Sequence, residues 1–311
     1  MQKIRCKSIL RQCLVPFGMR LGTFVQHAPR ALHAPNHPCM DQDEGLPSLC
    51  IVTPSLNQGR FLQGAIDSVL DQQYPALEYV VRDGGSSDET VDVLKSSTDR
   101  LTSWESQPDN GQASAINAGF KACGNEPKSE IMAWLNADDR LLPGSLQSVG
   151  RFFRDHPEVD VVYGNRLILN ESGEMVGRWV LPSHTPRAYM WRDYVPQETL
   201  FWRRSVWERA GGEIDESLDF AVDWDLLIRL GNAGARFHHL PEFIGAFTTH
   251  AQQKSLAIRT TVGIPEFENI QRRIAPTTAQ KWKSRIGSGW YMVQSSIADW
   301  KCTLTGNPTT R

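Results

Sequence analysis

The sequence predicts an α/β fold built on a central, mostly parallel β-sheet. In its first half, apolar runs of strand length alternate with segments of helical periodicity. A polar, acid-bearing loop also follows three of the predicted strands, as in open parallel sheets that bind ligands at their edge. With 311 residues, 40% hydrophobic and 22% charged, the composition is that of a globular protein and excludes wholesale disorder.

The chain begins its regular pattern with a strand–helix–strand unit. Residues 49–53 (LCIVT) and 79–82 (YVVR) are apolar runs of strand length. Between them, apolar residues from Phe61 to Leu70 recur at helical spacing. A single helix between two strands implies that they pair in parallel, because the chain must cross back over the sheet.

The same alternation continues to about residue 164 and then loosens. The second half is mixed, with a hairpin turn at 170–174 (NESGE) and shorter elements. The later predicted helices are 89–96, 112–123, 143–155, 205–210 and 224–230, and the later predicted strands are 101–105, 131–135, 159–164, 198–202 and 237–240.

Charge divides the chain into three parts: a basic, proline-containing extension (1–46), a main domain (47–255) and an amphipathic helical extension (256–311). Residues 1–40 hold six Lys/Arg and no acid, residues 251–311 hold nine basic and three acidic residues, and the middle holds the remaining 18 basic and 32 acidic residues. An acidic centre argues against nucleic acid as a partner, whereas the basic ends favour contact with an anionic surface.

The C-terminal extension carries one apolar stripe at helical spacing. Its members follow at intervals of three and four residues and include three tryptophans: Trp282, Ile286, Trp290, Val293, Ile297, Trp300 and Leu304. The pattern favours a helix that packs its stripe on the main domain. Because basic residues stand beside the tryptophans, a helix lying on a membrane surface is the alternative.

Cysteine spacing and hydropathy predict a cytoplasmic protein. The six cysteines are scattered without a C-x-x-C pair, so neither a zinc knuckle nor a disulfide framework is readable from their spacing, which favours a reducing compartment. No window approaches 18 consecutive apolar residues, and the N-terminal apolar runs are too short for a secretory signal.

The chemistry is expected where the strands of the parallel sheet end. The loops 53–59, 82–88 and 136–139 each follow one predicted strand and should meet at one edge. Asp138 and Asp139 are adjacent carboxylates after a very apolar strand, and their repulsion is best offset by Mg²⁺ or Mn²⁺; capping of the following helix would explain only one of them. The dinucleotide fingerprint, the P-loop and the Gly-x-Ser-x-Gly elbow are absent.

Three segments, in order and at suitable spacing, resemble the motifs of family 2 glycosyltransferases, which have the GT-A fold. They are IVTPSLNQGRFLQGAIDSVLDQQYPALEYVVRDGGSSDET, QPDNGQASAINAGF and WLNADDRLLPGSL, and the likeness covers about residues 48–250. The resemblance implies a GT-A domain that binds a nucleotide-sugar, with a mixed acceptor half and a C-terminal helical extension.

Carried over position by position, the resemblance implies a donor site. Thr53, Pro54 and Asn57 match the loop around the nucleotide, and Asp83 matches the acid that contacts the base, usually uracil. Gly111, Gln112 and Asn117 match the segment that closes over nucleotide and sugar. Asn136-Ala137-Asp138 stands in the family's Asp-x-Asp position, with an uncharged Asn136 in place of the first carboxylate, so the metal role falls on Asp138 and less surely on Asp139.

The resemblance also implies catalytic residues in the second half. Asp223, in FAVDWDLLIRLG, matches the family's general base, although Val222 replaces the usual preceding Glu; helix capping is the alternative role for Asp223 or Asp225. Apolar neighbours would raise the pKa of Asp223. His250, in TTHAQQKS, matches a closing-loop residue that contacts metal or diphosphate.

The resemblance to this family implies a metal-dependent, inverting glycosyltransferase. It would use a nucleotide-diphosphate sugar, with UDP favoured, and Mn²⁺ or Mg²⁺, on a glycan or lipid-linked acceptor in cell-surface polysaccharide or glycolipid synthesis, at the inner leaflet of the membrane. Two alternatives stay open. A nucleotidyltransferase shares the sheet plan, and a catalytically silent nucleotide-sugar-binding or scaffold protein would explain Asn136 and Val222.

Overall fold

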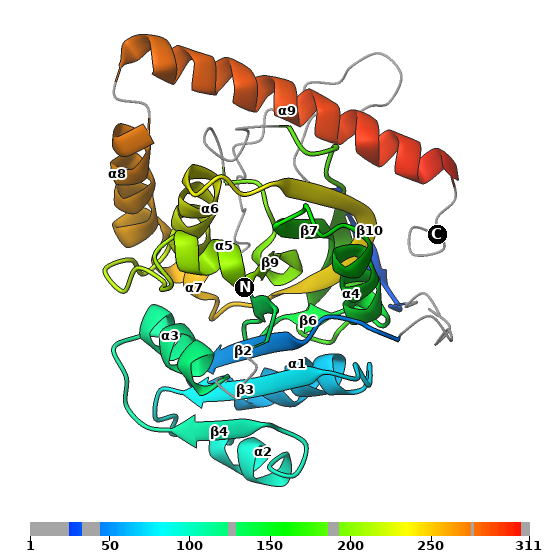
Figure 1. Cartoon of the computed structure of the whole chain (residues 1–311), viewed down its shortest axis with the longest axis vertical. Helices are drawn as coiled ribbons and strands as arrows, with labels where there is room; N and C mark the ends of the chain where they lie inside the picture. The colour runs from blue at the N-terminus through cyan, green and yellow to red at the C-terminus, as the bar shows by residue number, and fades with distance from the viewer. Residues whose placement is uncertain (1–24, 33–43, 124–128, 186–192, 275–276, 306–311) are drawn as a thin grey trace, which may run out of the picture.

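The computed structural model describes residues 25–32, 44–123, 129–185, 193–274 and 277–305. Ten strands among them form one sheet in the order β1-β8-β7-β9-β5-β2-β3-β4, with β10 paired to β7 and to β6 (Figure 1). The strands are β1 (Val25–Arg30), β2 (Leu49–Ser55), β3 (Leu77–Asp83), β4 (Ser103–Ser106), β5 (Ile131–Trp134), β6 (Arg140–Leu141), β7 (Val161–Asn170), β8 (Met175–Trp179), β9 (Phe201–Arg203) and β10 (Phe237–Thr249).

The first-half strands form the parallel part of the sheet, as predicted. β2 pairs in parallel with β3 on one side and with β5 on the other, and β3 pairs in parallel with β4. The chain therefore runs outward through β3 and β4 and then returns to the opposite side of β2. This reversal leaves a crevice at the carboxyl ends of β2 and β5, where open α/β sheets bind their ligands.

The second half of the sheet is mixed. β7 pairs in parallel with β10 but antiparallel with β8 and β9. β1 adds an antiparallel edge strand to β8, from a segment in which the sequence predicts no strand. Its sequence, VQHAPR, lacks an apolar alternation and contains Pro29, which is tolerated because β1 lies at the edge.

Helices cover both faces of the sheet and enclose two main hydrophobic clusters. One cluster joins α1, α2 and α4 to the sheet, and the other joins α3, α5, α6 and α8 to the opposite face. The helices are α1 (Gly59–Leu70), α2 (Thr90–Ser96), α3 (Gln112–Ala122), α4 (Ser145–Asp155), α5 (Arg204–Arg209), α6 (Val222–Asn232), α7 (Lys254–Ala257), α8 (Ile264–Ile274) and α9 (Thr278–Thr305), with a 3₁₀ turn at Gln197–Thr199 and a π turn at Arg259–Gly263.

A disulfide links Cys50 in β2 to Cys123 after α3, across a sequence separation of 73. Both residues are fully buried in the cluster beneath α3. The cysteine spacing, from which no disulfide framework could be read, did not indicate this pair. The cysteines accordingly give no support to a reducing compartment.

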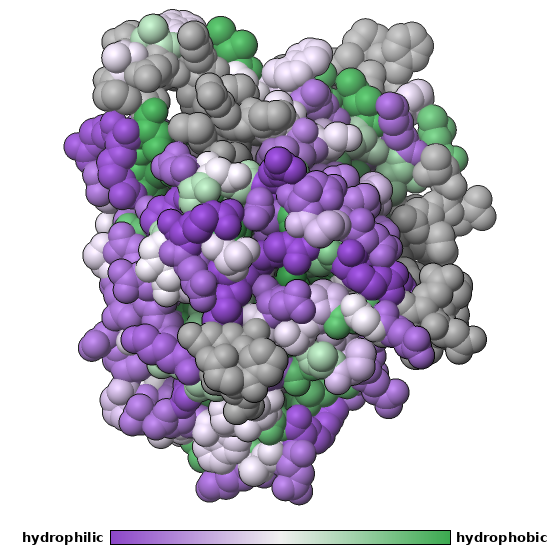
Figure 2. Space-filling view, in the orientation of Figure 1, coloured by the Kyte–Doolittle hydropathy of each residue, from purple (hydrophilic) through white to green (hydrophobic). Residues whose placement is uncertain are grey.

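Helix α9 crosses one end of the molecule, beside β10 and away from β2–β4 (Figure 1). The favoured prediction that its apolar stripe packs on the main domain is wrong, because the stripe is exposed; Trp290, for example, is 60% exposed. Elsewhere the face shown in Figure 2 is mainly hydrophilic. Among the residues that the structure describes, we find no helix both long and apolar enough to span a bilayer.

Candidate active site

A cavity of about 560 Å³ opens at the carboxyl ends of β2 and β5. Seven of the predicted site residues line it, from loops that are up to 169 positions apart in the chain: Pro54, Gly111, Gln112, Asn136, Asp138, Asp139 and Asp223. Seven carboxylates but only two basic side chains, Arg166 and Lys254, line its wall. The cavity is therefore strongly acidic.

Three other predicted residues organise the loops beside this cavity. Asp83 is 2% exposed, and its carboxylate accepts hydrogen bonds from Ser86, through both N–H and hydroxyl, and from the Ser106 hydroxyl at 2.6 Å. Asn57 has a left-handed backbone (φ 52°), and its Oδ1 accepts the N–H of Ser87 at 2.9 Å. Thr53 is buried, with Oγ1 2.9 Å from the Tyr79 hydroxyl. These contacts fix the loops after β2 and β3 against each other.

Asn136 is the centre of an amide network across the cavity floor. Its Oδ1 accepts a hydrogen bond from Gln112 Nε2 at 2.7 Å. Its Nδ2 donates to Asp139 Oδ2 at 3.2 Å and to Gln197 Oε1 at 3.0 Å. Gln197 in turn donates to the Trp134 carbonyl at 2.8 Å. Both ends of the Asn136 amide are thus used, in a way that a carboxylate could not reproduce.

Asp138 and His250 form the pair best suited to a divalent cation. His250 Nε2 lies 2.9 Å from Asp138 Oδ2, and the Phe61 ring packs against the imidazole with centroids 4.6 Å apart. Arg60 Nη2 lies 3.4 Å from the other ring nitrogen. Within the described residues, no cluster of three or more His, Cys, Asp or Glu side chains is close enough to hold a metal by itself. A cation here would need further ligands from the substrate or water.

Asp139 and Glu198 place two further acids in the buried wall of the cavity. Glu198 accepts a bidentate ion pair from Arg166, with N–O distances of 2.7 and 2.5 Å. Asp139 accepts the N–H of Thr248 at 3.2 Å, so it does not cap the helix that follows it. Burial and the nearby Asp138 and Glu198 carboxylates raise the pKa of Asp139 well above its usual value.

Asp223 lies in the first turn of α6, where Oδ1 accepts the N–H of Trp224 at 2.8 Å. Burial raises the pKa of this carboxyl to about 6. Glu266 of α8 accepts the N–H groups of Asp219, Phe220 and Ala221 at 2.8–2.9 Å and so holds the segment just before α6. Asp223 therefore bonds an N–H group in the first turn of α6 and also lines the cavity.

Asn117 braces the loop before α6 and does not line the cavity. Its amide donates to the Ile214 carbonyl at 3.0 Å and accepts the Ile214 N–H at 2.8 Å. Nδ2 also donates to Glu216 at 2.8 Å. This side chain thus holds the segment around Ile214 and Glu216 in place.

Comparison with known proteins decides the family. The model for "Glycosyl transferase family 2" matches residues 50–212, which is more than half of the chain. The chain belongs to glycosyl transferase family 2. The predicted resemblance is therefore confirmed, and the described chain contains a family 2 glycosyltransferase domain.

Relatives of this family 2 domain are distant in sequence. It is 27% identical over 216 residues to the O-antigen biosynthesis protein RfbC of Myxococcus xanthus, covering 68% of this chain and 16% of that protein. It is 24% identical over 213 residues to the chondroitin synthase of Pasteurella multocida, covering 68% of this chain and 22% of that protein. A PGL/p-HBAD biosynthesis glycosyltransferase of Mycobacterium tuberculosis is 25% identical over 272 residues, and the match covers 82% of this chain and 98% of that protein.

Solved structures confirm the predicted GT-A fold. Staphylococcus aureus TarS 1–349 in complex with UDP-GlcNAc superposes with a TM-score of 0.58 and 18% identity, covering 73% of this chain and 65% of that one. The mannosyltransferase PcManGT of Pyrobaculum calidifontis, in complex with GDP-Man and Mn²⁺, superposes with a TM-score of 0.57 and 18% identity. The match covers 86% of this chain and 79% of that one. At these identities the similarity concerns the fold.

Sequence reasoning missed several residues that shape the site of this family 2 domain. Arg166, Glu198 and Lys254 line the cavity, while Glu266 and Arg273 reach α6 from α8. Lys254 stands four residues after His250, in the segment that the resemblance marked as a closing loop. The others lie far from any family motif, so spacing alone gave no indication of them.

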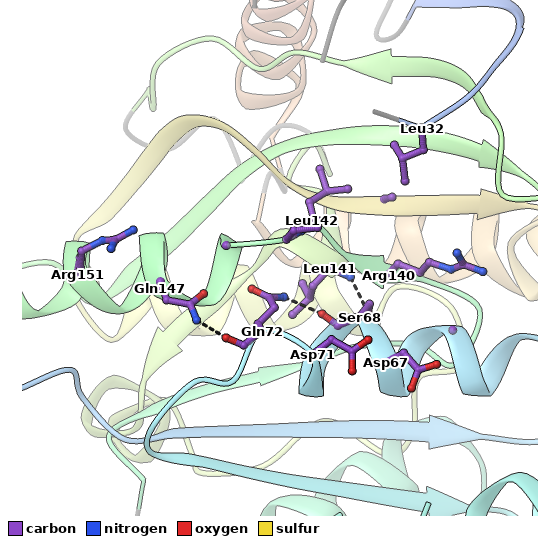
Figure 3. A pocket seen from close by; sticks show the side chains of 14 residues that line it. Leu32, Asp67, Ser68, Asp71, Gln72, Arg140, Leu141, Leu142, Gln147 and Arg151 are labelled. Carbon is purple, nitrogen blue, oxygen red and sulfur yellow. Dashed lines mark hydrogen bonds between the residues drawn. The ribbon is translucent and has the colours of Figure 1, made fainter. Parts of the chain in front are cut away.

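A second cavity of about 530 Å³ lies between α1 and α4, away from the carboxyl ends of the strands (Figure 3). Its Asp67 and Asp71 carboxylates are paired with Arg100 at 2.6 and 2.7 Å. Gln72 and Gln147 are joined across it by a hydrogen bond from Gln147 Nε2 to the Gln72 carbonyl at 2.5 Å. The predicted catalytic residues do not line this cavity, so the chemistry is assigned to the first one.

Proposed function

We propose that this protein is a metal-dependent, inverting glycosyltransferase that moves a sugar from a nucleotide-diphosphate sugar, with UDP as the nucleotide, to a hydroxyl acceptor. The observation that carries the proposal is that Asp138 and Asp223, from opposite halves of the chain, line one cavity at the switch point of the sheet. The acceptor is a glycan or lipid-linked sugar, in line with the polysaccharide and glycolipid roles in the names of the relatives.

Asp223 is the general base of the proposed reaction. The acceptor hydroxyl gives its proton to the Asp223 carboxylate as its oxygen attacks the anomeric carbon. The bond from that carbon to the diphosphate oxygen breaks on the opposite side, and its electron pair leaves with the diphosphate. One displacement without an enzyme-bound sugar inverts the anomeric configuration. The pKa of about 6 leaves Asp223 ionised at neutral pH but still basic enough to take a proton.

The donor set fits a hard divalent cation. Asp138 would supply a carboxylate oxygen and His250 an imidazole nitrogen, while Asp139 lines the same cavity as Asp138. When bound, Mn²⁺ or Mg²⁺ supplies positive charge for the diphosphate. The seven carboxylates around the cavity explain why a cation is needed, because without it they would repel a diphosphate. Arg166 is neutralised by Glu198. Of the two described basic side chains that line the cavity, Lys254 therefore remains as a positive charge for the diphosphate.

Product analysis tests this proposal. The chain is incubated with Mn²⁺ and UDP-glucose, UDP-galactose, UDP-N-acetylglucosamine or GDP-mannose, and nucleotide release and product configuration are followed by NMR. We expect turnover with a UDP-sugar, an inverted product, and loss of about 10³-fold in rate for Asp223→Asn. Asp92→Asn, which removes an exposed acid on α2, is the matched control.

Three outcomes would refute the proposal in different ways. Binding of the donors without turnover would favour the silent nucleotide-sugar-binding protein. Release of diphosphate from a nucleoside triphosphate would favour the nucleotidyltransferase. A retained configuration would contradict the single displacement on Asp223.

A further inference from the structure

Helix α9 concentrates the exposed apolar side chains of the described residues on one face. Of the eight large hydrophobic residues that are exposed, six lie on α9, with exposed fractions of 38–68%: Trp282, Ile286, Trp290, Ile297, Trp300 and Leu304. At about 100° per residue they share one side of the helix. Over residues 282–304 this exposed stripe extends about 33 Å at 1.5 Å per residue. A continuous apolar strip of this kind marks an interaction surface.

The opposite face of α9 is fixed to the sheet, so the stripe cannot simply turn inward. Asp299 accepts an ion pair from Arg178 of β8 at 2.7 Å, and Thr303 accepts a hydrogen bond from the same guanidinium at 2.6 Å. Ser295 is buried and its hydroxyl donates to the Val180 carbonyl at 2.8 Å. Tyr291 is buried with its ring 4.5 Å from that of Tyr194.

Charge and residue type identify the partner. In sequence, α9 has four basic residues, Lys281, Lys283, Arg285 and Lys301, and one acid. That acid, Asp299, is already neutralised by Arg178. Half of the exposed stripe consists of tryptophan, the residue whose amphipathic ring is enriched where hydrocarbon meets polar headgroups.

We propose that the exposed stripe of α9 docks the protein on an anionic lipid bilayer, with the helix axis parallel to the membrane plane. The apolar side chains enter the headgroup boundary, and the excess of positive charge in the sequence of α9 favours an anionic surface. A second copy of the chain fits less well, because two helices with an excess of positive charge would be brought together. The exposed stripe of α9 does not line the cavity that holds Asp138 and Asp223, and the proposal does not rest on the proposed function.

Vesicle flotation of the full chain tests the docking. We expect the chain to float with vesicles of phosphatidylglycerol and phosphatidylcholine, and to bind pure phosphatidylcholine at least tenfold more weakly. The triple variant Trp282→Ser/Trp290→Ser/Trp300→Ser should lose at least tenfold in partition coefficient. The triple Trp→Phe variant, which keeps apolar rings at the same positions, should retain most of it.

Quenching by brominated lipid locates the contact within the chain, which has ten tryptophans. Brominated acyl chains should quench the fluorescence of the full chain but not that of the triple Trp→Ser variant. Unchanged thermal unfolding of the variant shows that it still folds. If the triple Trp→Ser variant floats with the vesicles as well as the unaltered chain does, the proposal is overturned. So would a concentration-dependent dimer that the triple variant abolishes while vesicles leave both proteins in solution.

Discussion

Arg273 of α8 lies 2.9 Å from the Asp225 carboxylate of α6, the helix whose first turn carries Asp223. Asp225 is almost fully buried and also pairs with Arg229 at 2.7 Å. Together with the three backbone hydrogen bonds accepted by Glu266, this contact ties the C-terminal region to the candidate base. Helix α8 therefore acts on the active site from outside the cavity, by holding α6 in place.

Arg273→Ala should lower kcat about three- to tenfold, because Asp225 keeps Arg229 but α6 loses one tether. The affinity for UDP should stay within about twofold, since Arg273 does not line the donor cavity. Arg272→Ala serves as the control, because it removes the neighbouring guanidinium, which among the described residues donates to the Glu268 carbonyl of its own helix. Steady-state kinetics and UDP titration make the comparison. An equal loss of kcat in both variants would contradict a positioning role for Arg273.

The pH profile should report the burial of Asp223. A general base works when deprotonated, so the rate should fall as the pH drops through the pKa of about 6, by about tenfold per unit below it. An unperturbed aspartate would keep its activity down to pH 4. The measurement is kcat from pH 4.5 to 8.5 at saturating donor. A profile that is flat down to pH 5 would exclude Asp223 as the ionising group.

Asn136→Asp should harm the site rather than repair it, although it restores the family's carboxylate. The new side chain would lose both donor bonds of the Asn136 amide and face the buried Asp139. We expect a loss of about 1–3 kcal/mol in the free energy of unfolding without metal. Urea unfolding in EDTA measures it, with Asn136→Ser as a neutral comparison. Equal or greater stability of Asn136→Asp would show that the amide network contributes nothing.

Removing the disulfide should destabilise the domain, since it closes a loop of 73 residues in sequence. Cys123→Ser should lower the free energy of unfolding by about 2–5 kcal/mol under oxidising conditions. Cys302→Ser, at a half-buried cysteine that is not disulfide-bonded, is the control. Thiol titration of the denatured, unreduced protein checks the pairing directly. Reaction of both Cys50 and Cys123 under these conditions would refute the disulfide.

The parallel half of the sheet and its loops could be predicted from sequence because they depend on local patterns. Apolar runs gave β2, β3 and β5, and the chain direction brought their following loops together. The contacts of Glu266 and Arg273 could not be predicted, because they join residues about 45 positions apart without a repeating pattern. The spacing of Cys50 and Cys123 likewise carried no information on pairing.

The orientation of α9 is the clearest failure of the pattern argument. Periodicity correctly predicted a helix with one apolar stripe, but it assumed that the stripe faces the protein. Small and polar side chains such as Ser295 and Asp299 face the sheet instead, because Val180 and Arg178 offer them specific partners. A helix pattern fixes which residues share a side, but it does not fix which side packs.

Calorimetric titration of UDP into the full chain tests the central claim most directly, that Asp138 and a divalent cation hold the donor in this cavity. It is done with Mn²⁺, with EDTA and with Asp138→Ala, while Asp223→Asn serves as a variant of the same cavity that should still bind. We expect UDP to bind in Mn²⁺, to bind at least about a hundredfold more weakly in EDTA or in Asp138→Ala, and to bind Asp223→Asn normally. Tight binding that neither EDTA nor Asp138→Ala weakens would contradict the account.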